Sequence, residues 1–496
     1  MYSGQVLTIP CSRGGLNTSP AAESIPEMMV NARNLNLHNG GREKRGGTVL
    51  LTDSPVSTKI SGLYDFTTPT QANIVYYCST AGSIYKDAVN TIATGLSNEK
   101  GWFETFDKEL YFCNSYDIPL KWTGSGNMSA LTQVPTDWST TGNKPQYMIN
   151  HGRGNSQRMW AFGCPLTPYT IYISPNNDGD DFSNINVTTL RIDTGDTFGL
   201  VGGIVYLDQL LVFGRKKTFI IDDADTSPTN WGYFEAPWNM GAAHGRLVVK
   251  TPNDIVIMTE DGEIYSISAA QKYGDYQSAS LTRPAFIHKW IKDNVAMAYI
   301  NDFHAIYDPQ IRAIKFFVVR TGQTQVDTAL VYFIDRPPEE AWTIHDNTSY
   351  NSGYTASCSA LVRVSAGLYR VFTGDYSGNI WTLENSNTND NNNSFYASMY
   401  THPLKLDNPE LNKIFRRMYI SVIPQASEVL TINWWVDGSA QTAKTITISG
   451  AQREYKVELN KVGKRLQFEI ANSVINTKFF IKDVSLFYKQ LGELKK

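Results

Sequence analysis

The sequence predicts an all-β fold: a β-propeller of six or seven blades with a C-terminal β-sandwich and an irregular N-terminal arm. Composition is the first reason, because 12% of the 496 residues are aromatic and only 18% are charged, a balance that favours strands and turns over helices. The second reason is a strand motif that recurs at regular intervals. The third is an alternation of apolar and polar residues over the last hundred positions.

The recurring motif is a short strand in which an apolar residue is followed by an aromatic or apolar one. Its second position falls at Tyr85, Trp122, Tyr172, Ile220, Tyr265, Tyr307, Trp342 and Trp381, at intervals of 37, 50, 48, 45, 42, 35 and 39 residues. One four-stranded propeller blade takes roughly 40 to 50 residues. Because two motifs can lie on two strands of one blade, the spacing predicts six or seven blades within residues 49–384. A β-sandwich with coincidental spacing is the alternative.

The remaining parts of the chain differ in pattern from the propeller. Residues 385–394 contain no apolar side chain, so we expect an Asn-rich linker that contributes nothing to a core. In residues 395–496, apolar and polar positions alternate over six short segments, as at Leu430, Ile432 and Trp434. This period of two predicts antiparallel strands with one buried face, and therefore a compact C-terminal β-sandwich.

The N-terminal arm, residues 1–48, combines a Gly-rich start with a basic loop that ends in Arg45-Gly46-Gly47. We expect such an irregular segment to be held by the propeller, where it could close the ring, or by a neighbouring subunit. Basic residues in this loop and at the first strand of the sandwich are the candidate partner-interface residues: Arg42, Lys44, Arg45, Lys413, Arg416 and Arg417.

We find no catalytic signature and expect a protein that is not an enzyme and has no cofactor. Residues 214–218 end like a phosphate-binding loop but lack its glycines, and residues 375–378 lack the glycines of a nucleophile elbow. A site assembled from several blades stays open as an alternative. No metal site is expected from the spacing of the histidines and cysteines. The acidic loop 174–182 supplies one cation-loop candidate, made of Asn176, Asp178, Asp180 and Asp181.

Charge is distributed unevenly along the chain, although the net charge is only −3. Residues 395–496 hold fifteen Lys and Arg against nine Asp and Glu, a local charge of +6, which leaves −9 on residues 1–394. A protein this close to neutral is no nucleic-acid clamp as a whole. The first residues show no secretory signal, and the most apolar stretch, residues 200–213, is broken by Asp208. We therefore expect no membrane span and assembly in a cytoplasm.

Three stretches resemble the tail nozzle, also called tail hub or packaged-DNA stabilisation protein, of podovirus-type bacteriophages. They are residues 158–163 leading to 172–174, residues 211–215 leading to 219–221, and residues 413–417. The order of parts is similar as well, with a Gly-rich start, a propeller and a basic sandwich. One departure is that the early basic loop of such proteins often has Pro before its Gly, where this chain has Arg45.

The resemblance implies a structural virion protein of a viral tail. It implies a homohexamer forming a ring below the portal and adaptor, which retains packaged DNA, conducts it during DNA ejection and carries needle, fibre or spike proteins. The charge split suggests that acidic residues of positions 1–394 line the channel while the basic sandwich packs against acidic partners. The alternatives are a receptor-binding or glycan-processing tail propeller, and a monomeric propeller scaffold.

Overall fold

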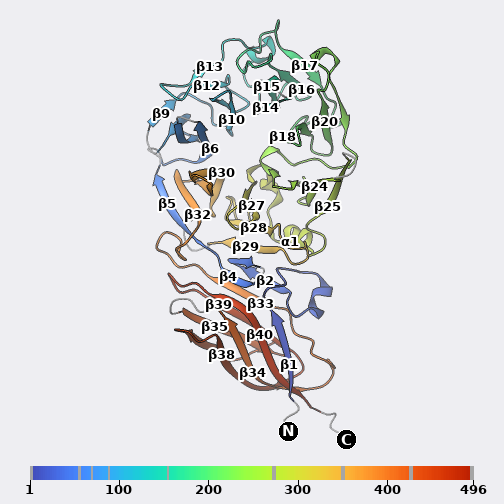
Figure 1. The fold of residues 1–496 in the computed structure, drawn as a ribbon, viewed down its shortest axis with the longest axis vertical. Coiled ribbons are helices and arrows are strands. Elements are labelled where there is room, and N and C mark those ends of the chain that lie inside the picture. The colour runs from blue at the N-terminus through green and yellow to red at the C-terminus, as the bar shows by residue number, and fades with distance from the viewer. Residues whose placement is uncertain are drawn as a thin grey trace.

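The computed structural model describes residues 4–38, 40–53, 57–68, 71–87, 90–153, 156–270, 275–347, 352–423 and 428–491. These residues form a propeller, seen down its axis in Figure 1, and a β-sandwich that extends from its rim. The all-β prediction of a propeller followed by a sandwich is confirmed. Both chain ends lie at the far end of the sandwich, so the molecule is elongated (Figure 1).

The described strands form seven four-stranded blades. The first five are β6–β9 (Ile60–Thr68, Gln71–Cys78, Ser83–Lys86, Asn90–Ala93), β10–β13 (Trp102–Phe106, Glu109–Cys113, Leu120–Trp122, Ser129–Ala130), β14–β17 (Tyr147–Arg153, Ser156–Phe162, Thr170–Ile173, Thr188–Arg191), β18–β21 (Gly202–Tyr206, Gln209–Phe213, Thr218–Asp222, Gly232–Glu235) and β22–β25 (Val248–Lys250, Asp254–Met258, Ile264–Ala270, Asp275–Ser280). Each blade is an antiparallel meander that begins at the propeller axis and ends at the rim.

The last two blades connect the propeller to the rest of the chain. Blade six is β26–β29 (His304–Asp308, Ala313–Val318, Thr328–Phe333, Trp342–Asp346), and blade seven is β30–β32 (Ala356–Ser365, Leu368–Asp375, Asn379–Asn385) with β5 (Gly47–Asp53) as its outermost strand. The innermost strands β30 and β6 lie side by side. The ring is therefore closed, and a strand from the N-terminal part completes its last blade.

Local sequence explains the blade hairpins. A turn at Asp261-Gly262 joins β23 to β24, and Gly262 has φ +83°, a left-handed conformation that residues other than glycine rarely adopt. All residues of β27 and β28 are buried, because both faces of a blade are covered by its neighbours.

The described residues contain few helices. They are α1 (Ile287–Asn294) and 3₁₀ turns at Pro20–Ser24, Thr136–Ser139, Pro228–Asn230, Gly245–Leu247 and Met297–Asp302.

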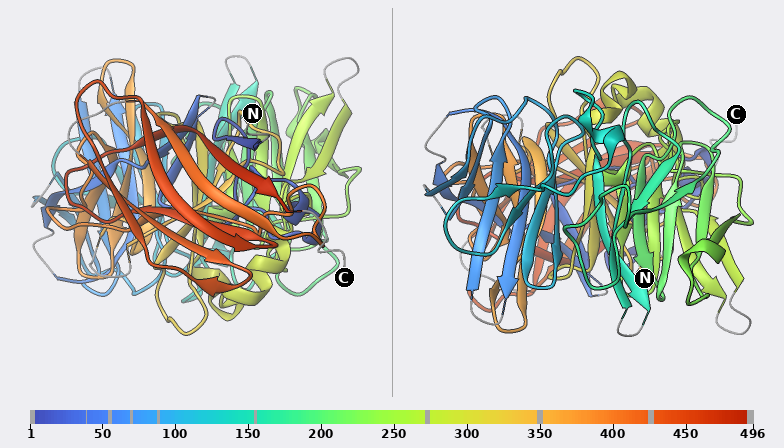
Figure 2. Two further views of the ribbon diagram at one scale, coloured as in Figure 1. Left: turned by 90° about the horizontal axis from the view of Figure 1, so that it is seen from below. Right: turned by 90° about the horizontal axis from the view of Figure 1, so that it is seen from above.

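The sandwich consists of two antiparallel layers. One contains β1 (Gln5–Pro10), β3 (Leu35–His38), β4 (Gly41–Lys44), β34 (Lys413–Val422), β38 (Glu454–Gly463) and β40 (Phe480–Gln490); the other contains β33 (Ala397–Thr401), β35 (Glu428–Val436), β36 (Ser439–Ala440), β37 (Lys444–Ile448) and β39 (Leu466–Asn472). Burial alternates strictly along β35, as the apolar pattern predicts. Viewed from below, these strands run obliquely across the end of the propeller (Figure 2).

Residues 1–48 differ from the expected irregular arm, because about half of the described ones are in strands. Strands β1, β3 and β4 complete one sheet of the sandwich, and β2 (Met29–Arg33) enters the other. Leu35 and Leu37 of β3 pack in the core that the sandwich shares with blade six. The chain then passes through β4 and continues directly into β5 of blade seven. The boundary expected at residue 48 is thus no domain boundary, since one continuous segment is shared by sandwich and propeller.

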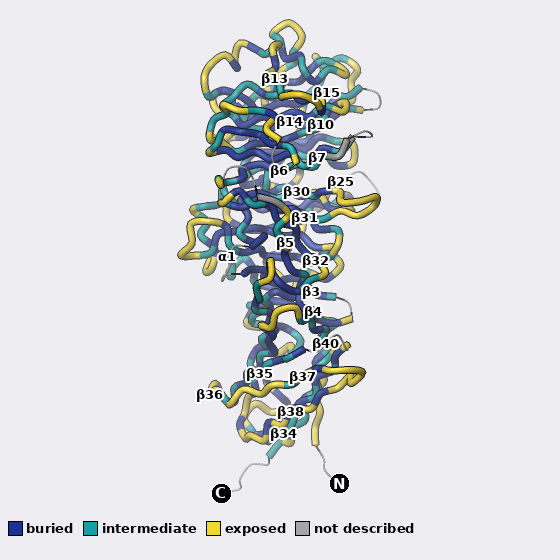
Figure 3. Tube along the Cα trace, turned by 90° about the vertical axis from the view of Figure 1, so that its left-hand side faces the viewer, coloured by how far each residue is buried: buried dark blue, intermediate teal, exposed yellow. Residues whose placement is uncertain are grey.

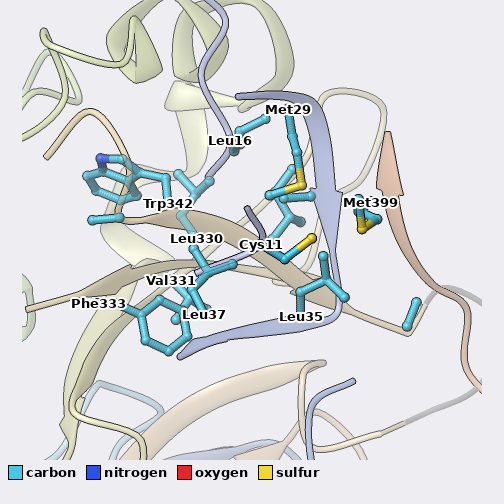
Figure 4. Close-up of a cluster of buried hydrophobic side chains, with 14 of the residues drawn as sticks. Cys11, Leu16, Met29, Leu35, Leu37, Leu330, Val331, Phe333, Trp342 and Met399 are labelled. Atoms are coloured by element: carbon cyan, nitrogen blue, oxygen red, sulfur yellow. The ribbon is translucent and has the colours of Figure 1, made fainter. Parts of the chain in front are cut away.

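One sheet of ten strands runs from blade six into the sandwich. Strand β2 pairs in parallel with β29 and antiparallel with β33, so the outer strand of the blade is followed directly by strands of the sandwich. Figure 4 shows the core beside this junction, where Leu16 and Met29 lie near Trp342 and Met399. Buried segments therefore run through both parts of the molecule, with exposed segments mainly at loops (Figure 3).

The Asn-rich segment 385–394 is not a free linker. Asn389 and Asp390 are buried, and the backbone N–H groups of Gly47 and Thr48 donate to the carbonyls of Asn387 and Asn389, at 2.6 and 3.2 Å. The expectation was wrong because it considered apolar side chains only. A polar segment can be buried when its groups find hydrogen-bond partners, as these do.

The shared sheet predicts that propeller and sandwich unfold in one cooperative transition. Trp342, fully buried at the junction, should cost about 3–5 kcal/mol of unfolding free energy when changed to Ala, because a large cavity is left. Phe198→Ala, at a site that is 52% exposed, is the matched control and should have little effect. Calorimetry checks the account: two separate transitions, with Trp342→Ala moving only one of them, would contradict it.

Candidate functional site

Four of the six candidate partner-interface residues are turned into the protein. Arg42, Lys44, Arg45 and Lys413 are each 0% exposed. The expectation that they contact a partner is therefore corrected. Sequence reasoning took a cluster of cations for a surface patch, whereas the fold supplies acceptors for them inside the chain. Arg42, Lys44 and Arg45 lie at the junction between propeller and sandwich, whereas Lys413 lies toward the chain ends, opposite Gln490 of β40.

Arg45 is the centre of this junction. Its guanidinium forms a bidentate ion pair with Asp390, with N–O distances of 2.9 and 2.7 Å, and its Nε donates to Asn34 Oδ1 at 2.7 Å. The guanidinium also lies 3.8 Å from the ring centre of Phe395 and 4.4 Å from that of Tyr354. Burial opposes the charged form, but Asp390 outweighs it and raises the pKa of Arg45 above its ordinary value.

A second buried ion pair lies next to the first. Lys315 Nζ donates to Glu384 Oε1 at 2.7 Å, and the backbone N–H of Gly46 donates to Glu384 Oε2 at 2.9 Å. Burial works against ionisation, yet Lys315 and His345 hold the pKa of Glu384 well below its ordinary value. Glu384 has φ +52°, a strained conformation for a residue with a side chain. These contacts explain how the strain is maintained.

The other buried cations are held by acceptors within the sandwich and N-terminal strands. Arg42 Nη2 donates to the carbonyls of Arg13 and Glu27, and Lys44 Nζ donates to Asn472 Oδ1 at 2.9 Å. Burial, with Arg45 nearby, lowers the pKa of Lys44 to about 7. Lys413 Nζ donates to the carbonyls of three residues: Asn408, Leu411 and Lys464.

Arg416 and Arg417 are the two candidates that reach the surface. Arg416 is exposed at a bulge in β34, where the pairing register with β38 and β40 shifts. Arg417 lies over Tyr419 and Phe487, 5.7 and 5.2 Å from their ring centres, on the outer face of the sandwich. These residues form what we call the arginine–aromatic face. Arg and aromatic residues are enriched in protein interfaces. The sequence-based prediction of a partner contact is therefore kept for Arg416 and Arg417.

The acidic loop 174–182 does not bring its four candidate ligands together. Asn176 accepts from Ser156, whereas Asp178 Oδ1 accepts the backbone N–H groups of Asp180 and Asp181 at 2.9 and 3.3 Å. The other two side chains have partners of their own: Tyr111 and Lys121 for Asp180, and Ser183 and Asn186 for Asp181. Within the described ranges, no group of three or more His, Cys, Asp or Glu could hold a metal ion. The loop is a series of hydrogen-bonded turns.

A cavity of about 430 Å³ lies at the propeller axis, between the innermost strands β6, β10, β22, β26 and β30. Its polar lining includes Glu104, Arg246 and His304. Arg246 belongs to the 3₁₀ turn before β22, and its Nη2 donates to the carbonyls of Ser61 and Gly101 in blades one and two. The side chain therefore crosses from blade five to the opposite part of the ring.

Burial changes the protonation of the groups in this cavity. It raises the pKa of Glu104 to about 8, and, together with Arg246, it lowers the pKa of His304 to about 3. At neutral pH both side chains are therefore uncharged. Burial also lowers the pKa of His244 to about 3, and its Nδ1 accepts the N–H of Arg246 at 3.3 Å.

Sequence reasoning missed the cavity residues. Glu104, Arg246 and His304 come from three blades and follow no spacing rule, so no motif identifies them. The sequence feature that could have indicated the cavity is glycine near the start of the inner strands, such as Gly245 before β22, because glycine allows a close approach of the backbone. A Cβ on Gly245 would come within 2.6 Å of the Tyr147 ring, which shows how closely the backbone approaches the axis there.

No protein-family model and no curated protein sequence matches the chain. Among solved structures, BBS1N in complex with ARL6DN is similar, with 9% identity and a TM-score of 0.42 over 70% of this chain and 98% of that one. The β-propeller domain of Swd1 from Myceliophteria thermophila has 7% identity and a TM-score of 0.42, over 69% and 100%. An exo-β-1,3-galactanase from Phanerochaete chrysosporium has 9% and 0.24, over 89% and 100%. Similarities at this identity concern the fold alone.

Arg45→Met should lower the free energy of unfolding by about 3–5 kcal/mol, because Asp390 is left buried without its partner. Arg312→Met is the matched control. Its partner is Asp335, and the two side chains are 50% and 44% exposed, so that pair should contribute less than about 1 kcal/mol. Denaturant titration of both variants measures the difference. Equal losses of unfolding free energy in Arg45→Met and Arg312→Met would show that the buried pair stabilises the fold no more than the exposed one.

Glu104 should make stability depend on pH. Because its pKa rises from 4.5 to about 8 on folding, the folded chain keeps a proton that the unfolded chain releases between these values. The free energy of unfolding should fall across this window, by at most about 1.4 kcal/mol per pH unit from this group. Glu104→Gln should remove that contribution, so its stability relative to the native chain should increase from pH 5 to pH 8. The exposed Glu410→Gln is the control, and parallel curves for Glu104→Gln and the native chain would reject the assignment.

Among the described residues, no helix is long and apolar enough to span a membrane.

Proposed function

We propose that the chain is a structural, non-enzymatic protein of a short phage tail, forming a ring-shaped nozzle. Copies of the chain close and extend the DNA channel below portal and adaptor proteins, retain packaged DNA and anchor needle, fibre or spike proteins. The proposal places the protein in the tail of the virion, after assembly in the host cytoplasm. Its first support is the sequence resemblance of three stretches to tail nozzle proteins.

The shared ten-stranded sheet is the structural observation that favours this function most. A nozzle subunit must hold its parts in fixed positions while DNA under pressure is retained. Strand β2 joins the outer strand of blade six to β33 without an intervening linker, and the Arg45–Asp390 pair lies beside this connection. Propeller and sandwich therefore move as one elongated unit, as a ring-forming subunit requires.

Surface chemistry suggests where copies and partners meet. Residues 395–496 carry the local charge of +6, and the arginine–aromatic face lies on their outer sheet. Complementary charge increases association rates and selects partners. We therefore assign this face to an acidic partner of the connector, and we propose that acidic residues of positions 1–394 provide much of the channel wall, which lets duplex DNA slide.

Electron microscopy of the full chain, alone and with a portal–adaptor complex, tests the assembly. We expect rings of about six copies around a central hole, because repeated head-to-tail contacts close into cyclic symmetry. A protein that stays a single chain of 55.5 kDa under both conditions, or a lumen lined mainly by Lys and Arg, would contradict the proposal.

Charge reversal on the arginine–aromatic face tests the partner contact separately. The double variant Arg416→Glu, Arg417→Glu should reduce incorporation into tails at least about tenfold while the chain stays folded, because like charges would oppose an acidic partner. Arg191→Glu, on the exposed edge of blade three, is the matched control. Normal incorporation of the double variant would remove this face from the interface. Cleavage of bacterial polysaccharide by the native chain would favour the glycan-processing alternative.

A further inference from the structure

Lys44 is buried against the side-chain amide of Asn472 in the core of the sandwich. Its Nζ donates to Asn472 Oδ1 at 2.9 Å and to the carbonyl of Val474 at 3.1 Å. Lys44 belongs to β4 of one sheet, and Asn472 is the last residue of β39 in the other. The contact therefore joins the two layers of the sandwich through residues that lie 428 positions apart in the chain.

The amine of Lys44 is in a state that can react. Burial, with the charge of Arg45 nearby, lowers the pKa of Lys44 to about 7, so a large share of the molecules carries an uncharged amine at neutral pH. The side chain has no contact with water, and the ring centre of Phe395 lies 4.5 Å from Nζ. A desolvated lysine with a lowered pKa is the form in which this side chain attacks carbonyl carbons.

The amide of Asn472 is held in one orientation. Its Nδ2 donates to the carbonyl of Val429 at 2.9 Å and to Thr477 Oγ1 at 3.0 Å. Because both hydrogens of Nδ2 are donated in this way, Oδ1 is kept on the side of Lys44. The residue is 2% exposed, so water does not compete with the amine for the carbonyl carbon.

Glu428 is the third buried polar group at this place. The side chain is 2% exposed, and its Oε1 has no hydrogen-bond partner among the described residues. The register between β35 and β39 brings Asn472 beside Leu430, so Glu428 lies two residues further along β35 on the same inner face. Burial raises the pKa of Glu428 to about 8, although the charge of Lys44 opposes this. The carboxyl group is therefore mostly protonated at neutral pH and can exchange protons.

We propose that Lys44 and Asn472 form an intramolecular isopeptide bond and that Glu428 carries the proton which this step moves. Lys44 Nζ attacks Cγ of Asn472, a C–N bond forms, and the bond from Cγ to Nδ2 breaks. Glu428 takes a proton from Nζ and delivers it to Nδ2, which leaves as ammonia. An amine and a primary amide give a secondary amide and ammonia, so the step balances without an oxidant, a reductant or a co-reactant.

The cross-link would enclose most of the chain, including the whole propeller. A covalent link restricts the unfolded chain, and the effect increases with the length of the enclosed segment. Force applied between the two sheets of the sandwich would also meet a covalent bond in addition to packed side chains. The reaction is a single step within the chain. It goes beyond the role of a nozzle subunit and does not depend on it.

Mass spectrometry of the full native chain tests the bond directly. We expect the intact mass to be lower than the mass of the sequence by one ammonia. Because trypsin does not cleave after a lysine whose amine is acylated, digestion should yield residues 43–45 joined to residues 466–478 as one branched peptide. Fragmentation of this peptide should place the link between Lys44 and Asn472.

Two variants, each with a matched control, assign the roles. Lys44→Met should keep the full mass of its sequence, whereas Lys413→Met should still lose ammonia, because Lys413 is equally buried but donates to backbone carbonyls only. Glu428→Gln keeps the size of the side chain and should reduce the cross-linked fraction at least about tenfold, since it cannot carry the proton. The exposed Glu410→Gln should behave like the native chain.

A native chain with the full mass of its sequence would overturn the proposal. So would ammonia loss that maps to other peptides, ammonia loss that persists in Lys44→Met, or an unchanged cross-linked fraction in Glu428→Gln. Circular dichroism checks that each variant is folded, and if one is not, the mass and the peptide map of the native chain decide. Ring formation is measured separately, so failure of the cross-link and failure of the nozzle assignment are distinguishable.

Discussion

The Arg45–Asp390 ion pair joins segments that the sequence keeps far apart. Arg45 lies between β4 of the sandwich and β5 of blade seven, while Asp390 lies between blade seven and the sandwich. Removing such a pair from water costs several kcal/mol per ion, and the cost is offset only by close contacts and complete hydrogen bonding. Here Asn34, Asn347 and the stacked rings of Phe395 and Tyr354 supply them. The path of the chain between the two parts depends on this arrangement.

The proposed structural role rests on how the parts are connected. The N-terminal segment completes both sandwich sheets and the last blade, so neither part can close without it. Forces on the sandwich therefore reach the propeller through paired strands and buried ion pairs. The polar cavity at the axis is the other distinctive feature, and Arg246 in its lining donates to the backbone carbonyls of Ser61 and Gly101.

The sequence was sufficient to predict the propeller, because its strand motif follows the blade period. The eight motifs cover all seven blades. Six blades carry one motif each, and blade six carries two, Tyr307 on its first strand and Trp342 on its last. The places of β1, β2 and β5 could not be predicted, since the strands with which they pair are more than 300 residues away. The burial of Arg42, Lys44 and Arg45 was missed for a related reason: their acceptors, which are backbone carbonyls, amide side chains and the Asp390 carboxylate, are brought near only by the folded chain.

Hydrogen exchange measured by mass spectrometry on Asp390→Asn, in conditions where the variant stays folded, tests the central claim most directly. If the ion pair holds propeller and sandwich together, protection should fall in parallel in β2, β5 and β33, which belong to different parts of the molecule. Loss confined to residues 385–394, with β2 and β33 as protected as in the native chain, would contradict the account.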